Sequence, residues 1–223
     1  MLNVLNGGMP IAELDKTNIA LIPKTSNPKR MVEFQPISLC NVIYKLISKI
    51  LANRLKTLLP QIITENQIAF TFDWLITDNV LVAFELMHYL NHKTLGKDGY
   101  MATKLDMSKA FDRVEWRFIQ KVMEKLGFNA RWVNLIMQCI TSVTYLVIIN
   151  GVAHGNFIPT RGLRQGDPFS PSLFLLCTEG LSALIHEIAR NQAVTGISIG
   201  RGCSKVTYLF FANDNIFFCK ASL

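Results

Sequence analysis

Acidic side chains occur at two places in this chain where they could act together on a cation. Asp106 follows the apolar run of residues 100–105, which we expect to form a buried strand, and Asp112 comes shortly after it. Asp214 lies in the turn-like sequence 212–215, between two further apolar stretches. If these stretches pair in one sheet with the run before Asp106, the carboxylates come close together. Converging carboxylates are the ligands that Mg²⁺ prefers, and two such ions can clamp an in-line phosphoryl transfer.

Each of these signals also has an ordinary explanation. An Asp at the end of a strand often serves as a turn or helix-cap residue, and Asn213-Asp214 is a good hairpin turn. A third segment, Arg161 to Pro168, holds glycines that let a backbone approach a ligand and arginines that can bind phosphates. It could equally be a surface loop before a helix. Each segment alone is a weak signal, and only the three together, in this order and spacing, are specific.

Composition and charge limit the possible classes of protein. Half of the 223 residues are apolar and 17% are charged, which excludes a disordered chain. The net charge is +7, and basic residues 1–60 (+5) and 113–140 (+3) flank the acidic residues 61–112 (−3). This pattern favours a polyanionic partner, with a cation at the acidic segment.

The five cysteines and the absence of targeting signals bear on the compartment. The cysteines form no C-x-x-C pair, so a zinc site or a disulfide framework is disfavoured. No signal segment opens the chain and no run of 18 apolar residues occurs, which disfavours secretion and membrane spanning. We expect an intracellular protein without a membrane partner, in the nucleus or the cytoplasm.

Strands and helices are expected to alternate along the chain, which gives an α+β fold. The helix over 41–59 is expected to bury Val42, Leu46, Ile50 and Leu55 and to expose its lysines. The Asn150-Gly151 pair predicts a hairpin, and Asp78 is a candidate N-cap. The expected strands are 19–22, 100–105, 145–149 with its hairpin partner, 205–211 and 216–219, and the expected helices are 41–59, 78–91, 114–126, 130–141 and 170–190.

Several long motifs together resemble the reverse transcriptases of non-LTR (LINE-type) retrotransposons, and the plant lineages most closely. The resemblance covers about residues 18–221. It rests on Leu105-Asp106-Met107-Ser108-Lys109-Ala110-Phe111-Asp112-Arg113-Val114, on Gly162-Leu163-Arg164-Gln165-Gly166-Asp167-Pro168 with Ser170-Pro171, on Phe210-Phe211-Ala212-Asn213-Asp214, and on Pro36-Ile37-Ser38-Leu39-Cys40-Asn41, the helix with Lys45 and Glu65-Asn66-Gln67.

This resemblance implies a right-hand polymerase palm, with an antiparallel sheet of three or four strands backed by helices, and helical fingers. On this basis residues 1–17 are a lead-in segment and 18–99 the fingers portion. Residues 100–223 are then the palm portion, truncated before the primer grip, with the thumb absent.

The resemblance also implies roles for individual residues. Asp106 and Asp214 would ligate two catalytic Mg²⁺ ions. Phe111 would be the steric gate that excludes a 2′-hydroxyl. Gln165 and Gly166 would line the incoming deoxynucleoside triphosphate, with Arg164 nearby, and Lys24 would be a fingers cation that faces the triphosphate or the template.

Three positions depart from the family pattern. Asn213 stands where the family has an Asp of the catalytic cluster, Gln35 replaces an Arg before Pro36, and residues 72–74 replace a Pro-Gly turn. The implied function is RNA-directed DNA polymerisation, which adds deoxynucleotides to a primer 3′ end on an RNA or DNA template and which Asn213 and truncation would impair.

Two alternatives remain open. One is a catalytically inactive nucleic-acid-binding remnant that is supported by the basic segments. The other is a chain that aggregates because apolar surface normally covered by the thumb is exposed. The oligomeric state stays undetermined.

Overall fold

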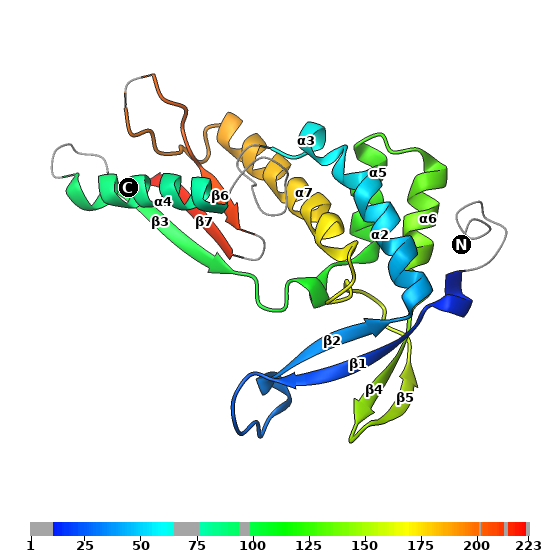
Figure 1. Cartoon of the computed structure of the whole chain (residues 1–223). Helices are drawn as coiled ribbons and strands as arrows, with labels where there is room; N and C mark the ends of the chain where they lie inside the picture. Colours follow the sequence, from blue (N-terminus) through cyan, green and yellow to red (C-terminus); the bar gives the residue numbers. More distant parts are fainter. Residues whose placement is uncertain (1–10, 65–75, 94–98, 201, 212–213, 222–223) are drawn as a thin grey trace. The chain divides into compact units, whose positions relative to one another are not determined.

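A computed structural model describes residues 11–64, 76–93, 99–200, 202–211 and 214–221 (Figure 1). The chain divides into two compact units, and each is assembled from separated segments. The first unit combines the described residues up to Thr57 with Phe111–Cys177. The second combines Leu58–Ala110 with Thr178 to the end of the described chain.

The first unit contains a four-stranded mixed sheet in the order β2-β1-β4-β5. Strand β1 (Lys16–Pro23) pairs antiparallel with β2 (Phe34–Cys40) and parallel with β4 (Thr144–Ile149). The turn at Asn150-Gly151 joins β4 to β5 (Val152–Phe157), so the predicted hairpin is confirmed. Strand β2 was not predicted, and it includes Pro36, which the sheet tolerates because β2 is an edge strand.

The helices of the first unit are α2 (Val42–Lys56), α5 (Trp116–Lys125), α6 (Ala130–Thr141) and the first part of α7 (Ser170–Arg190), with short 3₁₀ turns η1 (Ile11–Leu14), η2 (Met31–Glu33) and η3 (Phe111–Arg113). Asn41 caps α2 by accepting a hydrogen bond from Ile43 N, and Asn129 caps α6 by accepting one from Arg131 N. The two asparagines fix where these helices begin.

The buried face of α2 differs from the one predicted. Tyr44, Ile47 and Leu51 are buried, whereas Val42 is 73% exposed and Leu46 53% exposed. Leu55 was assigned correctly, and Lys45 and Lys49 are exposed as expected. The small residues Ser48 and Ala52 also belong to the buried face. A face that mixes large and small side chains packs closely against its neighbours, and a count of large aliphatic residues alone misses it.

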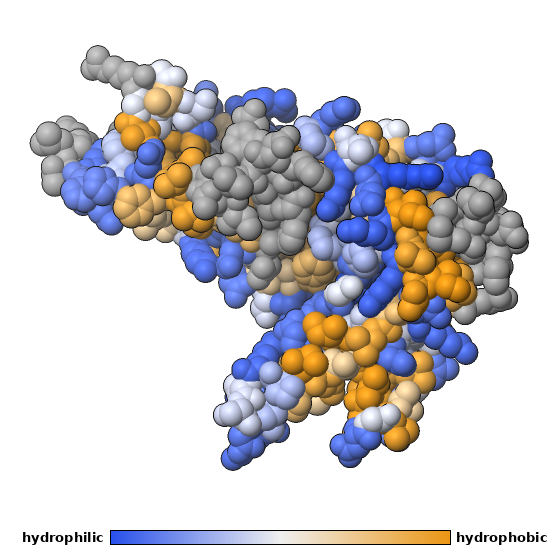
Figure 2. All heavy atoms as spheres, viewed as in Figure 1, coloured by the Kyte–Doolittle hydropathy of each residue, from blue (hydrophilic) through white to orange (hydrophobic). Residues whose placement is uncertain are grey.

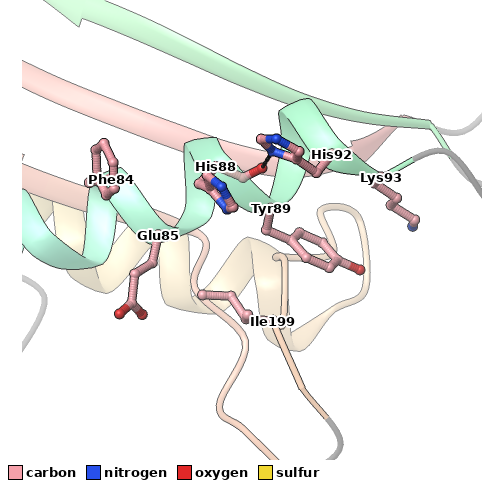
Figure 3. A pocket seen from close by; sticks show the side chains of 7 residues that line it. All are labelled: Phe84, Glu85, His88, Tyr89, His92, Lys93 and Ile199. Atoms are coloured by element: carbon pink, nitrogen blue, oxygen red, sulfur yellow. Dashed lines mark hydrogen bonds between the residues drawn. The ribbon is translucent and has the colours of Figure 1, made fainter.

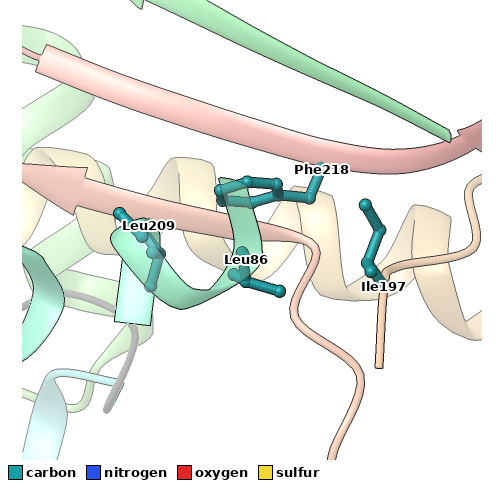
Figure 4. Packing of buried hydrophobic residues seen from close by; sticks show 5 residues of the cluster. Leu86, Ile197, Leu209 and Phe218 are labelled. Atoms are coloured by element: carbon teal, nitrogen blue, oxygen red, sulfur yellow. The ribbon is translucent and has the colours of Figure 1, made fainter. Parts of the chain in front are cut away.

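The second unit contains a three-stranded antiparallel sheet in the order β3-β7-β6, which comprises β3 (Gly99–Asp106), β7 (Asp214–Ala221) and β6 (Tyr208–Phe211). Its helices are α3 (Leu59–Ile62), α4 (Ile76–His92) and the rest of α7. Helix α4 packs on the sheet through Leu86, which lies among Leu209, Phe218 and Ile197 (Figure 4).

The structure corrects three predictions in this unit. Strand β3 is an edge strand with Met101 and Leu105 half-exposed, not a buried strand. Strand β6 begins only at Tyr208, after an isolated bridge between Ile197 and Val206. Helix α4 begins at Ile76, so Asp78 lies inside it and is not its N-cap.

The α+β class is confirmed, with two sheets where the element pattern suggested one. Among the described helices, α7 is long and apolar enough to cross a membrane by length and composition. However, 56% of its most apolar 18-residue window is buried inside the protein, as in the core helix of many proteins.

Candidate active site

Two of the predicted metal ligands are neighbours in the sheet of the second unit. In the antiparallel pair β3–β7, Asp106 is the register partner of Asp214. Directly opposed residues in an antiparallel pair have Cβ atoms about 4.5–5.5 Å apart, so the two side chains can share one cation. Asp214 is also the partner of Phe211 on β6. The sequence predicted this juxtaposition, and the β3–β7 register is what produces it.

A lysine that the sequence analysis did not single out contacts this carboxylate pair. Lys104 Nζ lies 3.0 Å from Asp214 Oδ1, and both side chains are partly exposed. Lys104 is two residues before Asp106, so both side chains project from the same face of β3. The ammonium therefore lies where it partly balances the negative charge of the pair.

The carboxylate pair fits a hard cation in chemistry, because carboxylate oxygens are the donors that Mg²⁺ prefers. Within the described residues, no three His, Cys, Asp or Glu side chains gather to hold a metal ion. Asn213, the third member of the predicted cluster, lies outside the described residues, as do Glu65-Asn66-Gln67 and residues 72–74.

In the first unit, the glycine-rich segment is bonded directly to η3. Gly162 N donates to Val114 O and Leu163 N donates to Phe111 O, both at 2.8 Å. The indole Nε1 of Trp116 donates to Gly162 O at 2.7 Å. These bonds join the two motifs into one framework, although they lie far apart in the sequence.

Two glycines of this segment have backbone conformations that L side chains rarely adopt. Gly162 has φ +96°, and a Cβ there would lie 3.0 Å from Asp112 O. Gly166 has φ +97° and approaches the edge of β2, where Ser38 N donates to Gln165 O at 2.8 Å. The glycines therefore serve close backbone packing against η3 and β2.

The side chain of Gln165 is held between two polar groups. Its Oε1 accepts a hydrogen bond from Gln35 Nε2, and its own Nε2 donates to Asp112 Oδ1 at 3.3 Å. Gln35, the departure from the family Arg, is thus a partner of a predicted nucleotide-binding residue. A pocket of about 210 Å³ lies here, lined by Ile19, Pro36, Ser38, Asp112, Tyr145, Arg161, Gly162, Leu163, Arg164 and Gln165.

Phe111, the predicted steric gate, stacks on a second aromatic ring. Its ring centroid lies 4.8 Å from that of Phe174 on α7, and the two planes differ by 11°. Phe174 is buried, so it supports Phe111 from inside the protein. No signal in the local sequence marks Phe174, because the two positions come together only in the fold.

Arg164 points into the interior of the first unit. Its side chain is 2% exposed, and its guanidinium bonds to Asp15, to the Tyr44 hydroxyl and to Cys139 O. Burial alone would lower the pKa of Arg164, but Tyr44 and the carboxylates of Asp15 and Asp167 raise it, so the group stays charged. A guanidinium with these partners is held inside the first unit as part of its structural framework.

The remaining predicted residue, Lys24, follows β1 and is exposed. Its backbone N donates to Glu33 O at 2.8 Å, which closes the turn between β1 and η2. Lys24 does not line the pocket near Gln165.

A second concavity, of about 410 Å³, lies on α4 in the other unit (Figure 3). The rings of His88 and His92 stack with centroids 4.1 Å apart, and His92 Nδ1 lies 2.9 Å from His88 O. Glu85 points away from this ring pair in Figure 3, so the three side chains do not converge on one point. The concavity therefore gives no metal centre.

Comparison with solved structures places the fold. Telomerase from Candida tropicalis, solved without its C-terminal domain, superposes with a TM-score of 0.58 at 17% identity, over 93% of this chain and 44% of that one. Telomerase from Candida albicans, in complex with a fragment of telomeric RNA, gives 0.58 at 14% identity, over 92% of this chain and 38% of that one. The α+β fold is thus the one found in telomerase.

The sequence itself matches the family model of the reverse transcriptase (RNA-dependent DNA polymerase) over residues 22–222. The chain therefore belongs to the reverse transcriptase family, and it is a reverse transcriptase domain of the non-LTR retrotransposon type, as the motifs predicted.

Several of its curated relatives are proteins of mobile elements. The chain is 28% identical over 229 residues to the Pol polyprotein of the retrotransposable element R2DM of Drosophila melanogaster, of which it covers 20%. It is 27% identical over 198 residues (89% of the chain) to a 149 kDa protein of transposon TX1 of Xenopus laevis, of which it covers 14%. An Arabidopsis thaliana mitochondrial protein, AtMg01250, is 46% identical over 69 residues, which are 31% of this chain and 57% of that protein. The chain thus spans only part of the length of these relatives.

Proposed function

We propose that this chain carries the catalytic core of an RNA-directed DNA polymerase, which adds deoxynucleoside monophosphates to a primer 3′ end and releases pyrophosphate. The register pairing of Asp106 with Asp214 is the observation that carries the proposal. Family membership supports it, because reverse transcriptases use divalent metals. The proposed partners are an RNA or DNA template–primer and deoxynucleoside triphosphates.

The proposed metal ligands are Asp106 and Asp214, with Mg²⁺ as the ion and two as the expected number. A divalent cation held there would supply Lewis-acid stabilisation of the transferred phosphoryl group. Asn213 offers an amide oxygen in place of a third carboxylate. One negative charge is thereby lost, and if that charge supplies about 3–5 kcal/mol of stabilisation, the rate falls about 10²–10⁴-fold.

The proposed nucleotide contacts come from the first unit. Gln165 lines the pocket, and the Phe111 ring, stacked on Phe174, would be the flat surface that excludes a 2′-hydroxyl. Gly166 permits the close approach of backbone, and Lys24 adds an exposed cation next to β1. Arg164 is proposed to act through the loop and not through direct contact.

The second candidate function is an inactive nucleic-acid-binding remnant. Asn213 and the ion pair between Lys104 and Asp214 favour it, since both reduce the negative charge available to a metal. The basic residues 1–60 and 113–140 would then supply the binding surface.

Primer extension on an RNA template distinguishes the two candidates. The chain as it stands, Asn213→Asp and the control Asp106→Ala are compared in Mg²⁺ and in Mn²⁺. Extension by Asn213→Asp that Asp106→Ala abolishes in the same background supports the polymerase. If no variant extends the primer while all of them bind the template–primer irrespective of divalent ions, the chain is a nucleic-acid-binding remnant and not a polymerase.

A further inference from the structure

A buried charge cluster connects the glycine-rich loop to the segment just before β1. Arg164 Nη1 bonds to Asp15 Oδ1, and the side chain of Asp15 is fully buried. On its other side, Arg164 Nε lies 3.5 Å from Asp167 Oδ2. One guanidinium is therefore held between two carboxylates, and its Cζ lies over the Tyr44 ring, 4.1 Å from the ring centroid.

Asp15 is itself fixed by other parts of the first unit. Its Oδ2 accepts a hydrogen bond from Ser142 Oγ at 2.7 Å, and its backbone O accepts one from Thr144 N at 3.2 Å. These contacts anchor Asp15 to the end of α6 and the start of β4. Burial raises the pKa of Asp15, whereas Arg164 and the Ser142 hydroxyl lower it. The carboxylate therefore depends on these partners to remain charged.

The cluster leads directly to the residue that faces the pocket. Arg164 precedes Gln165, whose backbone O accepts from Ser38 N and whose side chain lies between Gln35 and Asp112. A planar guanidinium with several fixed acceptors has one orientation, in contrast to a flexible ammonium. The backbone at Arg164 is thus fixed from inside, and the position of Gln165 follows.

We propose that Asp15 is a positioning residue of the site: by holding Arg164 inside the protein, it keeps the Gly162–Gly166 loop in the conformation that presents Gln165 at the pocket. The match to the family model begins at residue 22, so Asp15 lies before the matched segment. The assignment of Gln165 to the nucleotide rests on the proposed function, whereas the effect on the loop does not.

The effect on the loop is measured on the full chain by NMR. The indole N–H of Trp116 donates to Gly162 O and reports the loop position, and its resonance is assigned with Trp116→Phe. Asp15→Asn is expected to shift this resonance and to speed hydrogen exchange at the Ser38 amide. Ser142→Ala, which removes one bond to Asp15 and no charge, is expected to give a smaller shift in the same direction.

A control variant separates loop displacement from general loss of stability. Leu55→Ala truncates a buried side chain near the end of α2 and removes none of the hydrogen bonds or ion pairs described for the cluster. It is expected to lower the melting temperature while leaving the Trp116 resonance and Ser38 exchange unchanged. If Asp15→Asn and Ser142→Ala also leave both readouts unchanged, the proposal is wrong; if Asp15→Asn does not fold, Ser142→Ala alone decides.

The functional consequence is measured in the Asn213→Asp background. There Asp15→Asn is expected to raise the KM for the deoxynucleoside triphosphate about tenfold, with kcat within about twofold, because displaced binding contacts act on substrate and transition state alike. Leu55→Ala should change neither constant below its melting temperature. If the parent variant extends no primer, the proposed polymerase function fails, and the NMR readouts still test Asp15.

Discussion

At the scale of single residues, the glycine-rich loop depends on backbone positions that no other residue fills well. Gly162 and Gly155 both have a positive φ, but they differ in their surroundings. A Cβ at Gly162 would lie 3.0 Å from Asp112 O, whereas nothing lies within 4 Å of one at Gly155. Comparing substitutions at these two glycines therefore separates the free energy lost to the backbone conformation from that lost to the close contact with Asp112.

We therefore expect Gly162→Ala to destabilise the protein more than Gly155→Ala does. The left-handed backbone should cost about 1–2 kcal/mol in each variant. The contact with η3 should add about 1–3 kcal/mol in Gly162→Ala alone, as overpacking does. Urea unfolding measures the free energy of unfolding of both variants. Equal destabilisation would contradict the prediction, because the backbone at Asp112 would then move away from the new methyl group at no cost.

A second prediction at this scale concerns the pH dependence of stability through Glu179. Burial raises the pKa of this carboxyl, against the opposing hydrogen bonds from Thr64 N at 3.0 Å and from the Thr64 hydroxyl. The folded protein thus holds this proton more tightly than the unfolded chain does. The stability from this group is fully present below the unfolded pKa of about 4.5 and is lost as the pH rises through the folded pKa.

Glu179→Gln removes this ionisation and keeps a side-chain oxygen for Thr64. We expect the free energy of unfolding of the wild type, relative to that of Glu179→Gln, to fall between pH 4 and pH 7. Denaturant unfolding at both pH values measures the difference. A difference that stays unchanged or rises with pH would contradict the raised pKa. The contributions of the other carboxyls cancel in this difference, because both proteins contain them.

At the scale of elements, α7 supports the 3₁₀ turn η3 through the stack of Phe174 on Phe111. Phe174→Leu keeps an apolar side chain in the buried position but removes the flat surface behind Phe111. We expect about tenfold weaker discrimination against ribonucleoside triphosphates in the Asn213→Asp background, because a looser gate leaves room for a hydroxyl group.

Single-nucleotide incorporation with matched deoxy- and ribonucleotides measures this discrimination. Phe169→Leu is the matched control, since Phe169 is as deeply buried at the start of the same segment but is not in the Phe111 stack. An equal loss of discrimination in both variants would mean that the stack does not position the gate.

Much of this arrangement follows from local sequence signals, and the exceptions share a physical cause. The hairpin at Asn150-Gly151 and the long helix from Ser170 to Arg190 were predicted, because turn chemistry and apolar periodicity specify them. The approach of Asp106 to Asp214 was predicted on the condition that their strands pair in one sheet, and the β3–β7 register meets that condition. Strand β2 was missed because Pro36 usually interrupts strands, and only its place at the sheet edge permits it.

The missed site residues depend on distant partners. Asp15 bonds to Arg164 across 149 positions of the sequence, and Phe174 meets Phe111 only through the fold. Sequence motifs indicated that Arg164 and Phe111 matter, but not what holds them. The interpretation of Arg164 as a residue near the nucleotide follows from its place in the motif, whereas its burial follows from packing.

At the scale of the whole molecule, the charge distribution predicts how the chain binds nucleic acid. The net charge of +7 is concentrated in residues 1–60 and 113–140. If about four phosphates are contacted, affinity for a template–primer should fall about 10²-fold between 50 and 200 mM salt. Fluorescence anisotropy measures this slope, and Asp106→Ala should leave it unchanged. A flat salt response would exclude phosphate contacts as the main source of affinity.

Apolar surface is also distributed unevenly over the molecule. In the hairpin β4–β5, Ile149, Val152 and Phe157 are each 44–57% exposed, and the neighbouring Ile158 is 71% exposed. Figure 2 shows apolar (orange) surface over this hairpin. An apolar hairpin next to the pocket around Gln165 is a surface on which aggregation can begin.

The parallel pairing of β1 with β4 affects how this protein folds while it is synthesised on the ribosome. Strand β1 can form a hairpin with β2 as soon as Cys40 has emerged, but its other edge waits for Thr144–Ile149. While residues 41–149 are synthesised, the nascent chain therefore carries an apolar strand edge with unpaired N–H and C=O groups. Such edges attract chaperones and other nascent chains alike, and closing so long a loop is slow.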